Sequence, residues 1–345
     1  KEMNIKLTGI LGVAVAASLM VSNVTAKTIK VQASSKSGDW AHKFMTERYA
    51  PKLKAMTGGS LAITVLPTGA VVPYKESIDA VASGILDGDL NAISYFSGRD
   101  PAFAMIGDLI AGWDTPEQLQ NYCMTGGGRE MLQKIYDTLK VTAGKIHVIG
   151  CSPYSREALV SKTKITTVAG LKGVKIRSPE GLAAEVFRLV GAAPSALPFS
   201  EVYTSLEKGI VDAADASAYI NNTNSGMHKV AKFPIYPGIH SMANLQFIMN
   251  KKKWNKLSKD NQTALEVWYI AAYTEMRRAA DVEDKEQVAK DKAGGEITVV
   301  DWVQEERDKF RKIAVNAWEN FAKKSPLARE ALNSQLSFMK KMGML

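Results

Sequence analysis

Short apolar runs alternate with longer amphipathic stretches through the first two thirds of the chain. Apolar and β-branched runs predict strands, and apolar positions at helical spacing between Pro and Gly predict helices. The predicted strands are residues 28–32, 61–66, 89–94, 146–149, 158–161 and 174–176. The predicted helices are residues 40–56, 73–84, 182–190 and 200–208. This alternation is typical of parallel sheets covered by helices, and it indicates an α/β fold.

Helical spacing dominates the last third of the chain. A long amphipathic stretch opens at Leu257, and residues 297–300 have the pattern of a short strand. Residues 302–324 form a second amphipathic stretch, and residues 327–342 form a third after Pro326. A terminal helix of this kind either covers its own chain or packs on a partner.

One five-residue pattern occurs twice. Residues 84–88 (GILDG) and 209–213 (GIVDA) each follow a predicted helix with a capping Gly, an apolar strand start and an acidic residue. The chain is also long enough for two domains of about 100–200 residues each. The repeated pattern and the length together predict two related lobes.

The N-terminus has the pattern of a secretory signal peptide. Lys6 precedes an apolar run over residues 7–21, and the small residues of Val24-Thr25-Ala26 follow it. A membrane anchor is the weaker interpretation, because the run is short for a bilayer core of about 30 Å. We therefore predict that residues 1–26, including a short leader before Met3, are removed, and that the mature protein is exported to the periplasm.

The chain is basic, with a formal net charge of +9, and the predicted leader accounts for only one of these charges. A basic balance favours anionic ligands. Nucleic acid is a poor candidate, because the protein is predicted to be exported and has no cluster of basic and aromatic residues.

Cys123 and Cys151 are the two cysteines. Export permits a disulfide, but two cysteines are too few to form a framework for so long a chain. We expect two buried free thiols rather than a bond between them.

The sequence has no enzyme signature. It lacks the nucleophile elbow, the zinc-protease motif, the Walker loop and the dinucleotide-binding glycine motif. The four histidines have no metal-like spacing, and no cofactor site is predicted.

Arg177 is the most informative single residue. It ends the predicted strand 174–176, and Ser178 and Pro179 follow as a predicted helix start. Ligands in α/β sheets lie beyond the carboxyl ends of strands, where an Arg can form two parallel hydrogen bonds to a carboxylate. The alternative is a surface arginine or a salt bridge between lobes.

Four motifs are informative together: residues 170–177 (GLKGVKIR), 206–214 (LEKGIVDAA), 66–70 (LPTGA) with the helix to Gly84, and 250–254 (NKKKW). They resemble the motifs of the DctP-type solute-binding proteins of TRAP (tripartite ATP-independent periplasmic) transporters. The resemblance covers almost the whole predicted mature chain. It implies a two-lobed periplasmic-binding-protein fold with a hinge cleft, in which Arg177 binds the ligand carboxylate.

We expect residues 27–149 with about 238–300 in lobe I, residues 150–237 in lobe II, and residues 301–345 in C-terminal helices. Tyr236-Pro237-Gly238 and residues 325–345 resemble the branch that binds 2-oxo acids. In that branch the last helix is exchanged between subunits, which implies a homodimer.

The chain departs from that branch at its metal site. The branch places Gln, Glu and Trp around a cation that bridges to the ligand, and Arg156, Asp215 and Ala216 occupy the matching positions here. A guanidinium has no lone pair for a metal. We therefore predict a metal-free site in which Arg156 takes over part of the charge role and Asp215 pairs with it or accepts from the ligand.

Loops expected at the cleft supply further candidates for ligand contact, of which only some should touch the ligand. They are Trp40, Tyr95, Phe96, Tyr154, Tyr219, Asn221 and His240.

The predicted mechanism is closure of the two lobes on a small organic anion, which is then delivered to the membrane subunits of a TRAP transporter. The anion could be a carboxylate, a 2-oxo acid, a dicarboxylate or a sulfonate. One alternative is a binding protein for another importer or a sensor. A second is a periplasmic enzyme on the same scaffold, for which His240 would be the candidate base.

Overall fold

A computed structural model describes residues 26–239 and 241–345 of the chain. The signal-peptide prediction falls almost entirely on residues outside this range, and so does His240.

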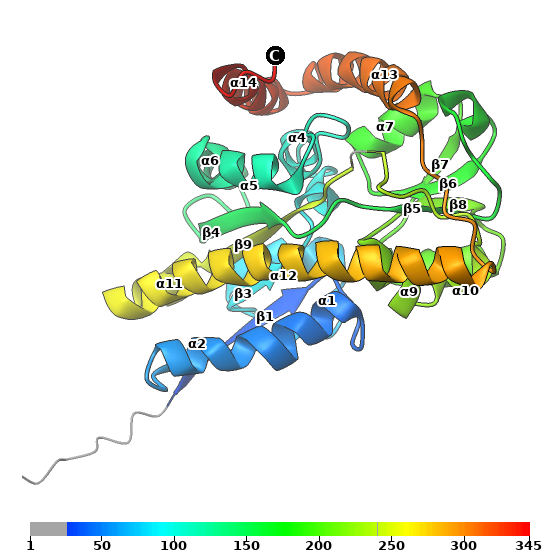
Figure 1. The fold of residues 1–345 in the computed structure, drawn as a ribbon. Helices are drawn as coiled ribbons and strands as arrows, with labels where there is room; N and C mark the ends of the chain where they lie inside the picture. Colours follow the sequence, from blue (N-terminus) through cyan, green and yellow to red (C-terminus); the bar gives the residue numbers. More distant parts are fainter. Residues whose placement is uncertain (1–25, 240) are drawn as a thin grey trace, which may run out of the picture.

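The first sheet has five strands in the order β2-β1-β3-β9-β4 (Figure 1). They are β1 (Lys27–Ala33), β2 (Leu61–Leu66), β3 (Gly88–Leu90), β4 (Ile146–Pro153) and β9 (Asn244–Asn250). β1 pairs in parallel with β2 and β3, whereas β9 runs antiparallel to β3 and β4. The parallel part follows from the strand–helix alternation at the start of the chain.

The second sheet has four strands in the order β5-β8-β6-β7. They are β5 (Leu159–Ser161), β6 (Lys175–Ser178), β7 (Ala193–Ala196) and β8 (Ala213–Asp215). β6 pairs in parallel with β7 and β8, and β5 is antiparallel. Two sheets, each with its own covering helices, confirm the predicted two-lobed α/β fold.

Helices cover both sheets. The helices before β4 are α1 (Trp40–Lys43), α2 (Ala50–Met56), α3 (Ser77–Ser83), α4 (Ala102–Gly107), α5 (Pro116–Thr125) and α6 (Gly128–Thr138). The later ones are α7 (Leu182–Leu189), α8 (Val202–Glu207), α9 (Tyr219–Asn224), α10 (Met227–Val230), α11 (Lys251–Asn255), α12 (Lys259–Gly294), α13 (Gln304–Ala322) and α14 (Pro326–Lys341). A π-helical turn over Phe44–Tyr49 joins α1 to α2, so the predicted helix 40–56 is continuous.

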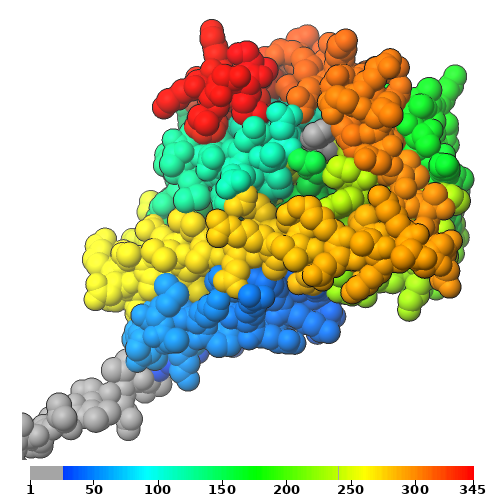
Figure 2. Space-filling model, viewed as in Figure 1, coloured from blue at the N-terminus to red at the C-terminus, as the bar shows by residue number. Residues whose placement is uncertain are grey.

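The 36-residue helix α12 runs across both halves of the molecule (Figures 1 and 2). Its first half buries Leu265, Trp268 and Tyr269 in the core of the five-stranded sheet. Near its other end, Asp284 accepts a hydrogen bond from the backbone N–H of Ile220, in the half built on the four-stranded sheet. One rigid element is therefore packed on both lobes.

The repeated glycine pattern is confirmed for the two caps, whereas the strands begin only after the acidic residues, at Gly88 and Ala213, and not at the apolar residues that follow each Gly. Gly84 ends α3 with φ 86° and leads to β3, and Gly209 follows α8 with φ 70° and leads to β8. Both glycines adopt the left-handed conformation that ends helices.

The predicted helix start after Arg177 is wrong. β6 continues through Ser178, and α7 begins only at Leu182 after Gly181, whose φ is 87°. A Cβ atom at Gly181 would lie 2.7 Å from Cβ of Ala104 on α4. Only glycine therefore fits at this turn, both for its positive φ and for the close approach of α4.

Two predicted strands are also corrected. The strand at residues 89–94 ends at Leu90 and gives way to a 3₁₀ turn over Ile93–Phe96. The strand at residues 297–300 is reduced to one isolated bridge between Ile235 and Val300. Apolar composition alone does not distinguish a short strand from a buried turn.

The terminal helix α14 covers its own chain. It lies above α4 and α6, next to α13 (Figure 1). Gln335 is fully buried and donates to the carbonyl of Met105, while Phe338 packs on Trp113. The sequence left open whether this amphipathic helix covers its own chain or packs on a partner, and in the single chain it covers its own chain.

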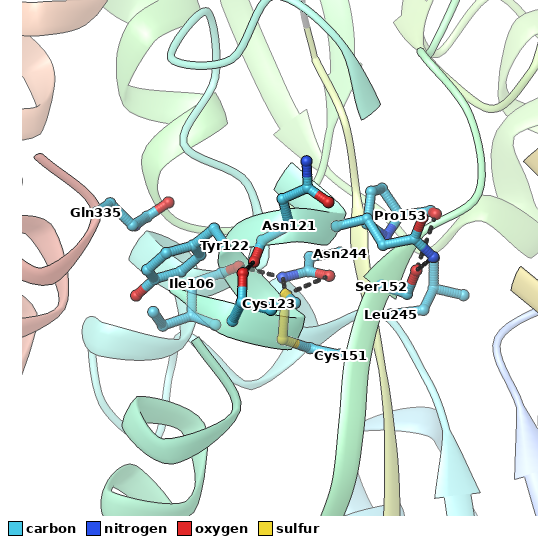
Figure 3. The surroundings of a disulfide bond; sticks show 12 residues. Ile106, Asn121, Tyr122, Cys123, Cys151, Ser152, Pro153, Asn244, Leu245 and Gln335 are labelled. Atoms are coloured by element: carbon cyan, nitrogen blue, oxygen red, sulfur yellow. Dashed lines mark hydrogen bonds between the residues drawn. A yellow bond between two sulfur atoms is a disulfide. The ribbon is translucent and has the colours of Figure 1, made fainter. Parts of the chain in front are cut away.

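The expectation of two free thiols is wrong, because Cys123 on α5 and Cys151 on β4 form a disulfide (Figure 3). Their Cα atoms lie 5.6 Å apart, within the usual range for such a bond. The cysteines are 28 residues apart, and only the packing of α5 on β4 brings them together. Asn244 on β9 donates to the sulfur of Cys123.

We expect the double substitution Cys123→Ala with Cys151→Ala to lower the free energy of unfolding by about 2–4 kcal/mol, because a cross-link over a loop of this length restricts the unfolded chain. Urea unfolding of the mature protein, with and without a reductant, measures the change. The reductant should leave the double variant unaffected. The disulfide would be contradicted if the unsubstituted protein had the same urea midpoint of unfolding with and without the reductant.

Candidate ligand-binding site

A cavity of about 70 Å³ lies between the two sheets. Its polar lining residues come from both halves and from the linking segments: Ser34, Ser35, Ser94, Tyr95, Tyr154, Glu157, Arg177, Ser217, Asn221 and Tyr273. Its apolar wall consists of Ala33, Ala41, Met45, Leu90, Ala92, Pro179, Phe199, Ala243, Leu245 and Met276. An apolar wall with a few convergent polar groups is typical of a small-molecule site.

Arg177 is the cation of this cavity. It stands near the carboxyl end of β6 and is 2% exposed. Nε donates to the carbonyl of Leu197 at 2.8 Å, and Nη1 donates to the carbonyl of Asp215 at 2.5 Å. Hydrogen bonds to described residues leave Nη2 free, so the guanidinium is held in place with donors available for a ligand.

Hydroxyl and amide groups surround the guanidinium. The Tyr95 hydroxyl accepts a hydrogen bond from the backbone N–H of Phe199. This bond joins the half with the five-stranded sheet to the half with the four-stranded sheet. The hydroxyls of Tyr154 and Ser217 share a hydrogen bond. Asn221 completes the polar lining from α9.

A cluster of three buried carboxyl groups lies beside Arg177. Asp108, Glu157 and Asp215 each place one oxygen within 4.8 Å of the others. The Ser241 hydroxyl lies among them, 2.6 Å from Asp108 Oδ2, 3.1 Å from Glu157 Oε2 and 3.0 Å from Asp215 Oδ2. Of the three, only Glu157 lines the cavity.

Burial sets the electrostatics of this cluster. It raises the pKa of Asp108 to about 7, with a further contribution from Asp215. It raises the pKa of Asp215 to about 6, against the opposing charge of Arg177. The pKa of Glu157 is raised well above its ordinary value, by burial and by both aspartates. The cluster therefore favours protonated carboxyl groups.

Arg156 lies elsewhere. It lines a second cavity of about 720 Å³ with Tyr236, Arg277 and Asp281, and its guanidinium donates to the carbonyl of Asp114. Burial and the neighbouring Arg307 lower the pKa of Arg156. The structure thus separates Arg156 from Arg177, although the sequence analysis placed both on one ligand.

The remaining predicted residues divide between the cavity and its surroundings. Tyr95, Tyr154 and Asn221 line the cavity. Asp215 does not line it, but its backbone carbonyl accepts a hydrogen bond from Arg177. Trp40 stacks on Tyr154 and donates to Glu283. Phe96 packs on Phe103, and Tyr219 donates to Asp291.

Sequence reasoning missed Glu157, Ser217, Phe199 and Ser241. Glu157 adjoins Arg156, and successive side chains of an extended segment point to opposite faces. Of these two neighbours, Glu157 lines the cavity at Arg177 and Arg156 lines the second cavity. Ser241 carries no signal in a single sequence, because it acts only where two distant segments meet.

Within residues 26–239 and 241–345, no helix combines the length and apolar character needed to cross a bilayer.

The chain resembles characterised proteins over most of its length. The family model of the bacterial extracellular solute-binding proteins, family 7 (DctP), matches residues 32–325. A monocarboxylate 2-oxoacid-binding periplasmic protein of Nostoc is 28% identical over 339 residues, which are 95% of this chain and 91% of that protein.

Solved structures share the fold. A TRAP periplasmic solute-binding protein of Rhodobacter sphaeroides, in an apo open state, is 39% identical with a TM-score of 0.74, covering 92% of this chain and 99% of that one. A TRAP solute-binding protein of Bordetella bronchiseptica is 21% identical with a TM-score of 0.80, covering 92% and 93%. It is a mixed-occupancy dimer with copurified calcium and picolinate.

A buried arginine in a cavity between two α/β lobes agrees with the family match over most of the chain, and the chain therefore belongs to the DctP family of TRAP solute-binding proteins.

Proposed function

We propose that the protein captures a small organic anion in the cavity at Arg177 and presents it to the membrane subunits of a TRAP transporter. The observation that carries this proposal is the buried guanidinium, which two backbone carbonyls hold in place while it lines the cavity. A carboxylate that accepts from it replaces lost water with charge-assisted hydrogen bonds.

The lining of the cavity suits a small anion. A short carboxylate such as a 2-oxo acid can accept from Arg177, and its further oxygen can accept from Tyr154, Ser217 or Asn221. The apolar wall then surrounds its short carbon chain.

Closure of the lobes is the proposed mechanism. Arg177 and Ser217 belong to the half with the four-stranded sheet, whereas Ser94, Tyr95 and Met276 belong to the other half. An anion in the cavity contacts both halves and stabilises the closed arrangement. No residue of this set needs to act as a nucleophile, so we propose binding without turnover.

Calcium accompanies the ligand in the Bordetella relative, and the three carboxyl groups of Asp108, Glu157 and Asp215 lie close enough together to supply oxygen ligands to a cation. The Ser241 oxygen already lies 2.6–3.1 Å from all three carboxyl groups, so a calcium ion at about 2.3–2.6 Å from their oxygens would displace it. Arg177 supplies positive charge from the cavity side. We therefore propose a metal-free site, on the packing of Ser241 rather than on Arg156.

Export to the periplasm and a homodimer complete the proposal. A terminal segment with the pattern of a signal peptide supports export. The amphipathic pattern of α14 and the dimeric state of the Bordetella relative support a dimer.

We expect Arg177→Gln to weaken binding of pyruvate, the smallest 2-oxo acid, by about 100-fold or more, because it removes charge-assisted hydrogen bonds. Thermal-shift titrations of the mature protein measure this, since a ligand of the folded state raises the melting temperature. Arg188→Gln, at an exposed arginine on α7, is the matched control and should bind normally. Unchanged binding by a folded Arg177→Gln protein would contradict the site.

Arg156→Gln tests the sequence-based role of Arg156 separately. Because Arg156 lines the second cavity, we expect less than a threefold change in pyruvate affinity, on the order of the effect of a surface residue. A loss as large as that of Arg177→Gln would show that Arg156 reaches the ligand.

The metal-free proposal predicts that EDTA leaves the thermal shift with pyruvate unchanged. A shift that EDTA abolishes and that added calcium restores would contradict it. A titration of the Bordetella protein with picolinate, with and without EDTA, serves as the positive control for a metal effect.

The dimer is checked by light scattering of the mature protein after size exclusion. We expect twice the monomer mass at micromolar concentration. A single-chain mass at all concentrations would contradict the exchange of α14.

A further inference from the structure

The second cavity, of about 720 Å³, lies against both segments that connect the two halves. Ser155 and Arg156 line it from the connection between β4 and β5, and Tyr236 and Pro237 line it from the connection between α10 and β9. Residues of α12 between 277 and 285 and residues 115–117 at the start of α5 complete the lining. None of these residues lines the cavity at Arg177, so the two cavities are separate.

Charged side chains dominate the lining of the second cavity. The cations are Arg156, Arg277, Arg278 and Lys285, and the acids are Glu117, Asp281 and Asp284. A cavity whose cations were all paired with these acids would have little affinity for a further anion. The pairing of each acid therefore decides what the cavity can bind.

Two of the acids have partners other than the arginines. Asp281 forms a salt bridge with Lys285 at 2.8 Å, one turn along α12. Asp284 accepts from the backbone N–H of Ile220 at 2.7 Å. Burial raises the pKa of Asp284 to about 7, so this group carries only part of a negative charge near neutral pH.

The third acid, Glu117, is a weak partner. Its Oε2 lies 3.6 Å from Nη1 of Arg277, which is too long for a hydrogen bond, and its side chain is 65% exposed. An exposed carboxylate at this distance stabilises a guanidinium only slightly. The acids of the lining therefore leave the arginines largely uncompensated.

The donors of two arginines show the same deficit. The Arg277 side chain is only 11% exposed, and among the described residues its buried Nε has no hydrogen-bond partner. Arg156 donates to the carbonyl of Asp114, but no carboxylate of the described chain forms a salt bridge with it. Buried donors without an acceptor are rare, because each costs free energy.

We propose that the second cavity is a binding site for a small oxyanion from solution, held by Arg156 and Arg277 and independent of the anion at Arg177. A guanidinium matches two oxygens of a carboxylate, sulfate or phosphate group with parallel hydrogen bonds. Such a ligand supplies the acceptors that the two arginines lack, and the hydroxyls of Ser155 and Tyr236 can donate to its remaining oxygens. It connects α12 to both connecting segments.

Titration calorimetry of the mature Arg177→Gln protein tests this site, because the substitution removes the cation of the other cavity. Sodium sulfate, sodium phosphate and sodium succinate are the probes, each at an ionic strength held constant with sodium chloride. At least one should bind saturably with a Kd of about 1 mM or tighter. Succinate alone would identify a carboxylate ligand, and sulfate or phosphate alone would identify a tetrahedral anion.

Adding Arg277→Gln or Arg156→Gln to this protein should weaken binding of the same probe by about tenfold or more, because each removes charge-assisted hydrogen bonds. Arg188→Gln, at an arginine outside both cavities, is the matched control and should bind as the parent does. Circular dichroism shows which variants are folded, and Arg156→Gln decides the test if Arg277→Gln is not.

The proposal would be overturned if none of the three probes gave saturable heat, if the folded arginine variants bound as tightly as the parent, or if Arg188→Gln lost binding as well. Pyruvate titrations keep this result apart from the proposed function. With Arg177 intact, Arg277→Gln should change pyruvate affinity by less than about threefold, because Arg277 does not line that cavity.

Discussion

The position of one buried guanidinium organises the binding half of this protein. Arg177 is almost fully buried, and a buried charge is stable only when hydrogen-bonded and compensated. The carbonyls of Leu197 and Asp215 meet the first need, and they belong to the strand ends on either side of β6. The order β8-β6-β7 thus supplies the acceptors that hold the arginine, and the ligand supplies the missing anion.

Charge compensation of the buried guanidinium also bears on the three acids that lie beside Arg177. Asp215 offers its backbone carbonyl to Arg177 and its side chain to Ser241, so one residue connects the anion site to the interface between the lobes. Under the proposed function, a carboxylate at Arg177 would compete with these acids for one positive charge. Burial raises the pKa of all three acids and so lessens that competition.

The architecture could be predicted from periodicity, but the site only in part. Strand–helix alternation and the two glycine caps depend on local sequence, so β2 and α3 were found where the pattern placed them, whereas β8 begins a few residues later than predicted. Arg177 was found because it stands at a strand end. The disulfide and Ser241 depend on contacts between segments far apart in the chain, and no local pattern encodes such a contact.

Arg156 and Glu157 show which feature the sequence does not determine. The sequence analysis placed Arg156 at the ligand site, whereas the structure places Glu157 there. Both residues stand on an extended connection between the sheets, where neighbouring side chains point to opposite faces. Glu157 faces the cavity at Arg177, and Arg156 faces the cavity beside α12. With Arg156 inward, the site would hold two cations and would favour a doubly charged anion. With Glu157 inward, an acid whose pKa is raised by burial lies beside a single cation, so the cavity carries less positive charge than a pair of arginines would give it.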